Sequence, residues 1–559
     1  MAHLISDLKK LNNEIKGDVF EKFFSPNEFL DSPIMVIPYI LECCYNKYIL
    51  FREQESGNID LIDFSNFSKV RYDPYFLPGK DKKLVAKNIF QAIKEILNKE
   101  NENGLQIDYN LPYAFYKDLS LNLKKANILK PKINYIKKTN ILYSVNTEDI
   151  INRLKMYRQK AQPFARNLIL TSTDRSVLEQ GISKIEDSRF PLLNNIMKDN
   201  DFSAVLMSSN LNVQELIGLS LRNNEFSKVS VLYRLEDEKV FILSEFEINE
   251  PGIRKIDIFT DYFQALESIC SKNNKIGFED HLVSISEYDQ FIERNFLLRE
   301  GTLACRKWRE YRAGEDLVFY IIAGKASSYA MEKVLKEASS QINQNKYDLE
   351  RVLFKKYLDY FNKFKVEYNL PYKFIEYFTG FYVPDRTLYP SIPSKFRISE
   401  NSNEVKLDAG ILMVDSTGFI LGTTDIARTL ALSLSSSQIY EAIKDTIKNS
   451  IIPNIKNANT FEDIFIQGAK AFSEKSENML KKYNLCPSDF YIEKNYSRDI
   501  GHLMGKQESF DEKIIKGNKN KIRNNLIGCV EIQWQYKKHA LVYEDMWYKR
   551  GEGIANITG

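Results

Sequence analysis

Short apolar runs of strand length alternate with amphipathic stretches of helical period through the first half of the chain. The runs FSAVLMSS from Phe202, VSVLYRL from Val229 and VFILSEF from Val240 predict strands. The apolar spacing in SRFPLLNNIMKDN from Ser188 and in TDYFQALESICSKNN from Thr260 predicts helices. Strands that alternate with helices in this way are typical of an α/β domain.

A weak internal repeat suggests that this domain occurs twice. GLQIDYNLPYAFYKDLSLNL from Gly104 and KIGFEDHLVSISEYDQFIER from Lys275 each read as a buried strand, an acidic turn and an amphipathic helix. A basic helical segment follows each of them, beginning at Ile151 and Leu303. We therefore expect two related α/β domains in tandem.

The pattern changes near Ser328, where two long helices begin. Beyond them the chain reads as antiparallel strands, with helices in the segments that start at Ala427 and Phe461. This is an α+β pattern. The predicted domains are residues 1–163, 164–324 and 325–559.

Charge and composition exclude some classes of partner. The 78 Lys and Arg residues nearly balance the 75 Asp and Glu residues, so the net charge of +3 gives no reason to expect nucleic acid or an anionic membrane. No apolar run approaches the ~20 residues that span a bilayer, and the charged N-terminus does not resemble a signal peptide. The cysteines lack the spacing of a metal-binding motif, which favours free thiols in a reducing cytosol. We expect a cytoplasmic protein without a membrane segment.

Two aspartates stand out in the segment VDSTGFILGTTDIARTL, which runs from Val414 to Leu430. Asp415 and Asp425 lie in an otherwise apolar, Gly- and Thr-rich hairpin-like stretch. Aspartate is a poor strand residue and is seldom buried without a partner. Two inward aspartates therefore indicate a cation site.

The C-terminal third resembles the pita-bread metallopeptidases, the family of creatinase, aminopeptidase P and methionine aminopeptidase, and the three-part layout resembles long Xaa-Pro aminopeptidases. The matching motifs are KLDAGILMVDST, TTDIARTL, DIGHLMG, VYEDMWYK and the closing NITG. The resemblance implies two creatinase-N-like α/β domains before a pita-bread domain. It also implies five metal ligands, which are Asp415, Asp425, His502, Glu531 and Glu544.

Two of these assignments depend on the alignment frame. Asp408 competes with Asp415 for the first position, but the ten-residue separation of Asp415 from Asp425 is nearer the family spacing. Aligning Gly528 with the family glycine would put Trp534 in place of Glu531. The carboxylates and the imidazole suit two divalent ions, with Mn as the first choice and Zn, Co or Fe as alternatives.

The sequence departs from the family at groups that move protons. Active members carry a histidine upstream of the first aspartate, where this chain has Leu388, and another after the glycine-framed histidine, where this chain reads KQESFDE. The chain has four histidines, and His539 is the one candidate replacement. The Arg that usually precedes the last glutamate by two is Val542. We expect slow peptidase turnover, because each general acid–base group contributes about 10²–10⁴ in rate.

Three functions remain compatible with this pattern. The first is a metal-dependent hydrolase of Xaa-Pro aminopeptidase type with an altered substrate or reduced activity, and the second is C–N hydrolysis or lyase chemistry on a small molecule. The third is an inactive pseudo-peptidase that serves as a binding module. The expected substrate is a peptide or a small-molecule amide, and the long family forms suggest a homodimer.

Overall fold

The computed structural model describes residues 1–5, 39–52, 66–72, 86–108, 111–124, 126–130, 138–184, 187–221, 228–343, 350–382, 404–485, 499–536 and 539–559. The chain divides into two compact units. Unit 1 comprises Met1–Asn152 and Arg189–Cys305, and unit 2 comprises Arg153–Ser188 and Arg306–Gly559.

The first sheet of unit 1 is built from strands near the N-terminus. Its strands are β1 (Ala2–Ile5), β2 (Tyr39–Glu42), β3 (Lys47–Arg52), β4 (Ser68–Tyr72), β5 (Gly104–Ile107) and β6 (Asn127–Leu129). Their order is β4-β3-β2-β1-β5-β6. Helices α3 (Ile89–Lys99) and α4 (Tyr113–Asn122) accompany this sheet, and buried Leu, Ile and Ala side chains form its core.

The second sheet of unit 1 repeats this arrangement. Its strands are β7 (Asn140–Val145), β8 (Ala204–Met207), β9 (Val229–Arg234), β10 (Lys239–Ser244), β11 (Ile253–Phe259), β12 (Lys275–Phe278) and β13 (Leu297–Glu300), in the order β11-β7-β10-β9-β8-β12-β13. The helices are α7 (Arg189–Asp199), α8 (Asn210–Ile217), α9 (Tyr262–Ile269) and α10 (Ile285–Glu293).

The strand orders β3-β2-β1-β5-β6 and β10-β9-β8-β12-β13 correspond, and so do the strand directions. In each case the first two pairs are antiparallel and the last two are parallel. The segments that suggested the repeat form β5 with α4 and β12 with α10. The predicted tandem of related α/β domains is therefore confirmed.

Unit 2 contains an antiparallel sheet flanked by long helices. Its strands are β14 (Lys373–Tyr382), β15 (Glu404–Val414), β16 (Ile420–Thr423), β17 (Ile426–Ala431), β18 (Gly501–Met504), β19 (Glu508–Lys513), β20 (Leu526–Tyr536), β21 (His539–Arg550) and β22 (Gly553–Asn556). The main order is β14-β15-β17-β21-β20-β18-β19, with β16 beside β15 and β22 beside β21. The larger helices are α6 (Arg175–Ser183), α12 (Leu317–Asn343), α13 (Glu350–Glu367), α14 (Leu434–Thr446) and α16 (Phe461–Lys482).

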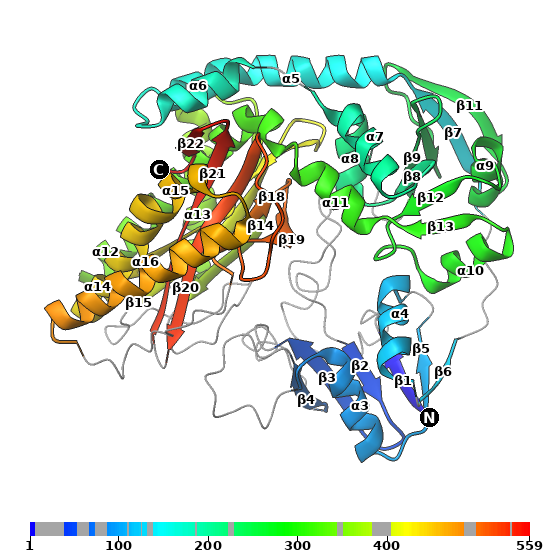
Figure 1. Ribbon diagram of the computed structural model, residues 1–559, viewed down its shortest axis with the longest axis horizontal. Helices are drawn as coiled ribbons and strands as arrows, with labels where there is room; N and C mark the ends of the chain where they lie inside the picture. Colours follow the sequence, from blue (N-terminus) through cyan, green and yellow to red (C-terminus); the bar gives the residue numbers. More distant parts are fainter. Residues whose placement is uncertain are drawn as a thin grey trace. The chain divides into compact units, whose positions relative to one another are not determined.

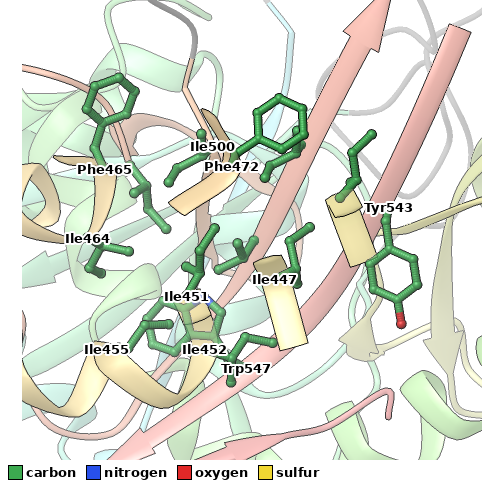
Figure 2. Packing of buried hydrophobic residues seen from close by; sticks show 14 of the residues in the cluster. Ile447, Ile451, Ile452, Ile455, Ile464, Phe465, Phe472, Ile500, Tyr543 and Trp547 are labelled. Carbon is green, nitrogen blue, oxygen red and sulfur yellow. The ribbon is translucent and has the colours of Figure 1, made fainter. Parts of the chain in front are cut away.

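One face of this sheet is covered by helices α14 and α16 (Figure 1). Isoleucines and phenylalanines of these two helices and of the segment between them pack on alternate residues of β20 and β21, including Val530 and Ile532. Figure 2 shows Tyr543 and Trp547 of β21 in this cluster. Since side chains alternate between the two faces of a strand, the residues between these positions project to the opposite face. That opposite face carries the candidate site.

Residues 153–188 pack with unit 2, although the sequence predicted a domain boundary at residue 163. Helix α5 (Thr147–Leu168) carries Arg158, whose guanidinium contacts Asp187 at 3.1 Å and Asp316 at 2.9 Å. Asp174, just before α6, accepts the backbone N–H of Asn556 at 2.8 Å. These polar contacts between distant parts of the sequence explain why local composition does not mark the boundary.

In the described part of the chain, none of the helices combines the length and the apolar character needed to cross a membrane.

Candidate metal centre

A row of paired residues crosses four neighbouring strands of the unit 2 sheet. Asp408 on β15 lies opposite Ala427 on β17, which lies opposite Glu544 on β21, which lies opposite Glu531 on β20. Directly paired residues of antiparallel strands project to the same face. The register alone therefore gathers three carboxylates on the face away from α14 and α16.

The same alternation adds Asp425, His502 and Cys529 to this face. Asp425 precedes Ala427 by two residues and Cys529 precedes Glu531 by two, while His502 on β18 pairs directly with Cys529. A two-residue step along a strand keeps the face. Gly501 makes the approach of β18 possible, since a Cβ there would lie 2.1 Å from the carbonyl oxygen of Cys529 and its φ is +135°.

The side chains of Asp425, His502, Cys529 and Glu544 form a compact cluster whose possible ligand atoms all lie within 4.8 Å of one another. His502 Nε2 is 3.4 Å from Asp425 Oδ2 and 3.9 Å from Glu544 Oε1. Cys529 Sγ lies 3.4 Å from the carbonyl oxygen of Asp425. Imidazole, carboxylate and thiol groups are all donors that can bind a transition metal.

The orientation of His502 is suitable for binding a metal through Nε2. Its Nδ1 lies 3.0 Å from the backbone carbonyl oxygen of Leu503, which can accept an Nδ1–H hydrogen bond. That bond would leave the Nε2 lone pair directed at the carboxylates, an arrangement common among metal-binding histidines.

Burial and negative charge together leave this cluster short of positive charge. Glu544 is 1 % exposed, and its Oε1 has no hydrogen-bond partner within the described residues. Burial, and then the negative charges of its neighbours, raise the pKa of Asp408 to about 7 and that of Glu531 to about 8. Burial followed by the charge of Asp425 also raises the pKa of Glu544. A bound cation would supply the missing charge.

The pKa of His502 also reflects the excess of negative charge in this cluster. Burial by itself lowers the pKa of its imidazole, but the hydrogen bond and charge of Asp425, with Glu508 and Glu531, outweigh burial and raise that pKa to about 10. Protonated His502 therefore neutralises part of the cluster in the absence of a cation.

Two residues of the TTDIARTL motif, Thr429 and Arg428, hold the part of β21 that carries Glu544. Thr429 Oγ1 donates to the carbonyl oxygen of Val542 at 3.0 Å and accepts from its backbone N–H at 2.9 Å. Arg428 lies on the helix-covered face, where it pairs with Asp545 at 2.6 Å and donates to the backbone carbonyl of Glu544. Arg428 thus holds the β21 segment that carries Glu544, although Val542 stands where the family has its arginine.

Asp415 does not join the cluster. Its Oδ1 accepts hydrogen bonds from the backbone N–H of Thr417 at 2.8 Å, the Thr417 hydroxyl at 2.7 Å and the backbone N–H of Phe419 at 3.0 Å. It caps the turn between β15 and β16, as aspartate commonly does in turns. Asp408 occupies the carboxylate position beside Asp425 instead, so this geometry does not support the choice of Asp415 over Asp408.

His539 is the first residue of β21 and pairs with Tyr536. It precedes Glu544 by five positions, which places the two Cα atoms about 17 Å apart along the strand. That separation is several times the reach of an imidazole side chain. Leu388, where the family has a histidine, lies outside the described residues.

Two neighbours of the cluster were missed in the sequence. Cys529 could have been found by strand alternation, since it lies two residues before Glu531. Glu508, in the KQESFDE segment, lies 4.0 Å from His502 Nε2 with a side chain that is 39 % exposed. Its contact follows from the β18–β19 hairpin, whose irregular register no local sequence pattern specifies.

No protein-family model and no curated protein sequence matches this chain. Among solved structures, the fold is similar to the N-terminal domain of the FACT complex subunit SPT16 from Cicer arietinum, with a TM-score of 0.51 and 13% identity over 66% of this chain and 95% of that chain. An X-prolyl aminopeptidase from Caenorhabditis elegans, described as a cytosolic enzyme with a di-nuclear active site, matches 98% of this chain and 83% of its own at a TM-score of 0.46 and 10% identity. The prolidase from Pyrococcus horikoshii OT3 matches 67% of this chain and 98% of its own at a TM-score of 0.46 and 14% identity. At these identities the likeness concerns the fold, and it agrees with the expected pita-bread architecture.

Proposed function

We propose that unit 2 binds a divalent metal ion through Asp425, His502 and Glu544 and acts as a metal-dependent hydrolase of Xaa-Pro peptidase type with low turnover on ordinary peptides. The observation that carries the proposal is the convergence of these three buried side chains, with Glu544 Oε1 left without a hydrogen-bond partner in the described residues. A buried carboxylate usually persists only when it is paired or binds a metal.

The arrangement favours one ion over the two that the family resemblance implies. A second ion beside Asp425 and Glu544 would need Asp408, but the Asp408 carboxylate already lies 3.6 Å from the ammonium group of the buried Lys406. Lys406 supplies a positive charge on that side of the row. We therefore expect a stoichiometry near one.

The remaining polar groups define what the chain contributes to a hydrolytic step. When bound, a divalent cation polarises the scissile carbonyl and lowers the pKa of a water ligand. Glu531 has a pKa raised to about 8 and accepts a hydrogen bond from Gln533 Nε2 at 2.5 Å. Glu531 lies directly opposite Glu544 on the same face of the sheet, and a carboxyl group there can hold and return a proton, so Glu531 is the best candidate general acid–base group.

Metal analysis and turnover together test the proposal. Dialysed protein is expected to retain about one divalent ion per chain, and Asp425→Asn should lose it, because a neutral amide is a weaker ligand. On a panel of Xaa-Pro peptides with Zn, Mn or Co supplied, we expect turnover well below ~10 s⁻¹, the median for enzymes. Residual turnover should be abolished in Asp425→Asn and kept in the control Glu441→Gln, whose side chain is 52% exposed on α14.

Other outcomes would point elsewhere. Metal without turnover of any Xaa-Pro peptide would favour C–N hydrolysis or lyase chemistry on a small molecule. If the protein retains no metal and shows no turnover, the proposal is contradicted and a binding module is favoured. Turnover near that of ordinary enzymes would show that the two missing histidines are not needed.

A further inference from the structure

We propose that Cys529 is a ligand of this metal centre, so that the site takes Zn²⁺ in preference to Mn²⁺. The inference rests on the proposed metal site and names its fourth donor. A thiolate is a soft ligand that suits zinc, whereas Mn²⁺ prefers carboxylate and other oxygen ligands.

The strand register brings the thiol to the cluster. Cys529 pairs with His502 across β20 and β18, and both side chains project to the face that carries Glu544 and Asp425. Tetrahedral zinc with bonds of about 2.0–2.3 Å places its ligand atoms about 3.3–3.7 Å apart. The separations of His502 Nε2 from Asp425 Oδ2, 3.4 Å, and from Glu544 Oε1, 3.9 Å, are close to that range.

A second observation points to a ligand at the same place. Glu544 Oε1 is buried and has no hydrogen-bond partner among the described residues, and it lies in the group of atoms that includes Cys529 Sγ. A cation between these atoms would satisfy the orphaned oxygen.

The alternative role for Cys529 is a small buried side chain with a weak S–H donor. Its Sγ lies 3.4 Å from the Asp425 carbonyl oxygen, which fits that role as well. Cys270 provides the comparison, because it is also buried but belongs to unit 1 and to no metal-ligating group in the described residues. The two cysteines should therefore differ in their response to metal.

Metal binding would require Cys529 to lose its thiol proton. The Cys529 S–H bond breaks, its proton passes to solvent, and the sulfur lone pair binds the cation without any change of oxidation state. The donors then comprise one imidazole nitrogen, two carboxylate groups and one sulfur. With four protein donors, a bound zinc ion would have to accept a fifth ligand before a substrate oxygen could bind.

The full chain tests this through metal affinity, with Zn²⁺ and Mn²⁺ titrated separately into wild type, Cys529→Ser, Cys529→Ala and the control Cys270→Ala. Loss of a group that only supports a ligand costs about 10–100-fold in affinity, so loss of a direct ligand should weaken Zn²⁺ binding by about 100-fold or more. Binding of Mn²⁺ should change much less, and Cys270→Ala should bind both metals as wild type does.

Cobalt provides a readout that a structural role would not change. The Co²⁺-loaded wild type and Cys270→Ala should show a thiolate-to-cobalt charge-transfer band in the near ultraviolet, and both Cys529 variants should lack it. If wild type binds Co²⁺ without this band and Cys529→Ser keeps the zinc affinity, Cys529 is not a ligand, while the metal site itself stands. If wild type binds none of the three metals, the proposed function fails and this inference fails with it.

Discussion

Asp408 and Asp415 show how strongly the surroundings of a side chain decide its role. Both occur in the segment KLDAGILMVDST, and each can be aligned with the first aspartate of the family motif. Asp415 accepts three hydrogen bonds at a turn and is partly exposed. Asp408 is 5 % exposed, and Asp425 and Glu508 help to raise its pKa. About 23 Å of strand separates the two, so they cannot serve one site.

This difference predicts opposite effects of two matched substitutions. Asp408→Asn should weaken metal binding about tenfold, because it removes a negative charge next to the ligands. Asp415→Asn should leave metal affinity within about twofold, since the amide oxygen can still accept the turn hydrogen bonds. Calorimetric titration of both variants with Zn²⁺ measures the difference. The reverse result would restore Asp415 as the ligand.

Glu310, at the end of α11 (Thr302–Glu310), is a second kind of buried acid in unit 2. It is 1 % exposed, and its Oε2 has no hydrogen-bond partner in the described residues. Burial raises the pKa of this carboxyl to about 7, although the nearby Arg309 acts in the opposite direction. Folding therefore favours its protonated form.

The sign of the resulting pH dependence follows directly. Below pH ~4.3, the pKa of an unfolded glutamate, both states hold the proton; between that value and about 7 only the native state does, so stability falls as pH rises. The stability that this proton contributes is up to about 4 kcal/mol; it is lost progressively between pH ~4.3 and ~7 and is gone above pH ~7.

Urea unfolding of unit 2 at pH 5 and pH 8 measures the effect. Wild type should lose more stability between these two pH values than Glu310→Gln, which stays neutral. The exposed control Glu441→Gln should follow the wild type. An equal loss in Glu310→Gln and wild type would show that Glu310 is ionised throughout.

At the scale of elements, β17 and β21 are joined by one backbone pair, Ala427 with Glu544, in the described residues. Where the next pair would fall, the Thr429 hydroxyl bonds both the N–H and the carbonyl of Val542. A hydroxyl can do this because it is donor and acceptor at once. The threonine of the TTDIARTL motif thus joins the strands that carry Asp425 and Glu544.

Thr429→Val should therefore destabilise unit 2 by about 1–3 kcal/mol, since two buried backbone groups lose their partner. It should also weaken metal binding, because Glu544 is no longer held relative to Asp425. The control Thr446→Val removes a buried hydroxyl that donates to the Ala442 carbonyl within α14. Denaturant unfolding should show a smaller loss for the control, and equal losses would exclude the bridging role of Thr429.

At the scale of the whole molecule, the chain uses one sheet topology twice in unit 1 and a different antiparallel sheet in unit 2. The domains predicted as 1–163 and 164–324 differ from the structure in detail, because β7 joins the second sheet and residues 153–188 pack with unit 2. Helix α12 also begins at Leu317, before the predicted boundary of the last domain. The composition of residues 153–188 does not distinguish them from their neighbours in sequence, so only their contacts in the structure assign them to unit 2.

Much of this protein is already determined by the sequence alone. Period-two and period-3.6 patterns determine the strands and helices, because each element must bury one face. The tandem repeat follows from two short segments, and the motifs predict Asp425, His502 and Glu544 as ligands, three residues whose side chains the structure places close together. These features depend on residues that lie close together in the sequence, so a short sequence pattern is enough to predict them.

Only the tertiary structure decided which further groups reach the site. The register of β15, β17, β21 and β20 selects Asp408 and excludes Asp415, and the pairing of β18 with β20 adds Cys529. His539 lies too far along β21 to contribute, although it is near Glu544 in sequence. Register depends on hydrogen bonds between strands that are up to about a hundred residues apart in the chain, and a shift of one residue would turn each carboxylate to the other face. Sequence spacing by itself cannot supply that information.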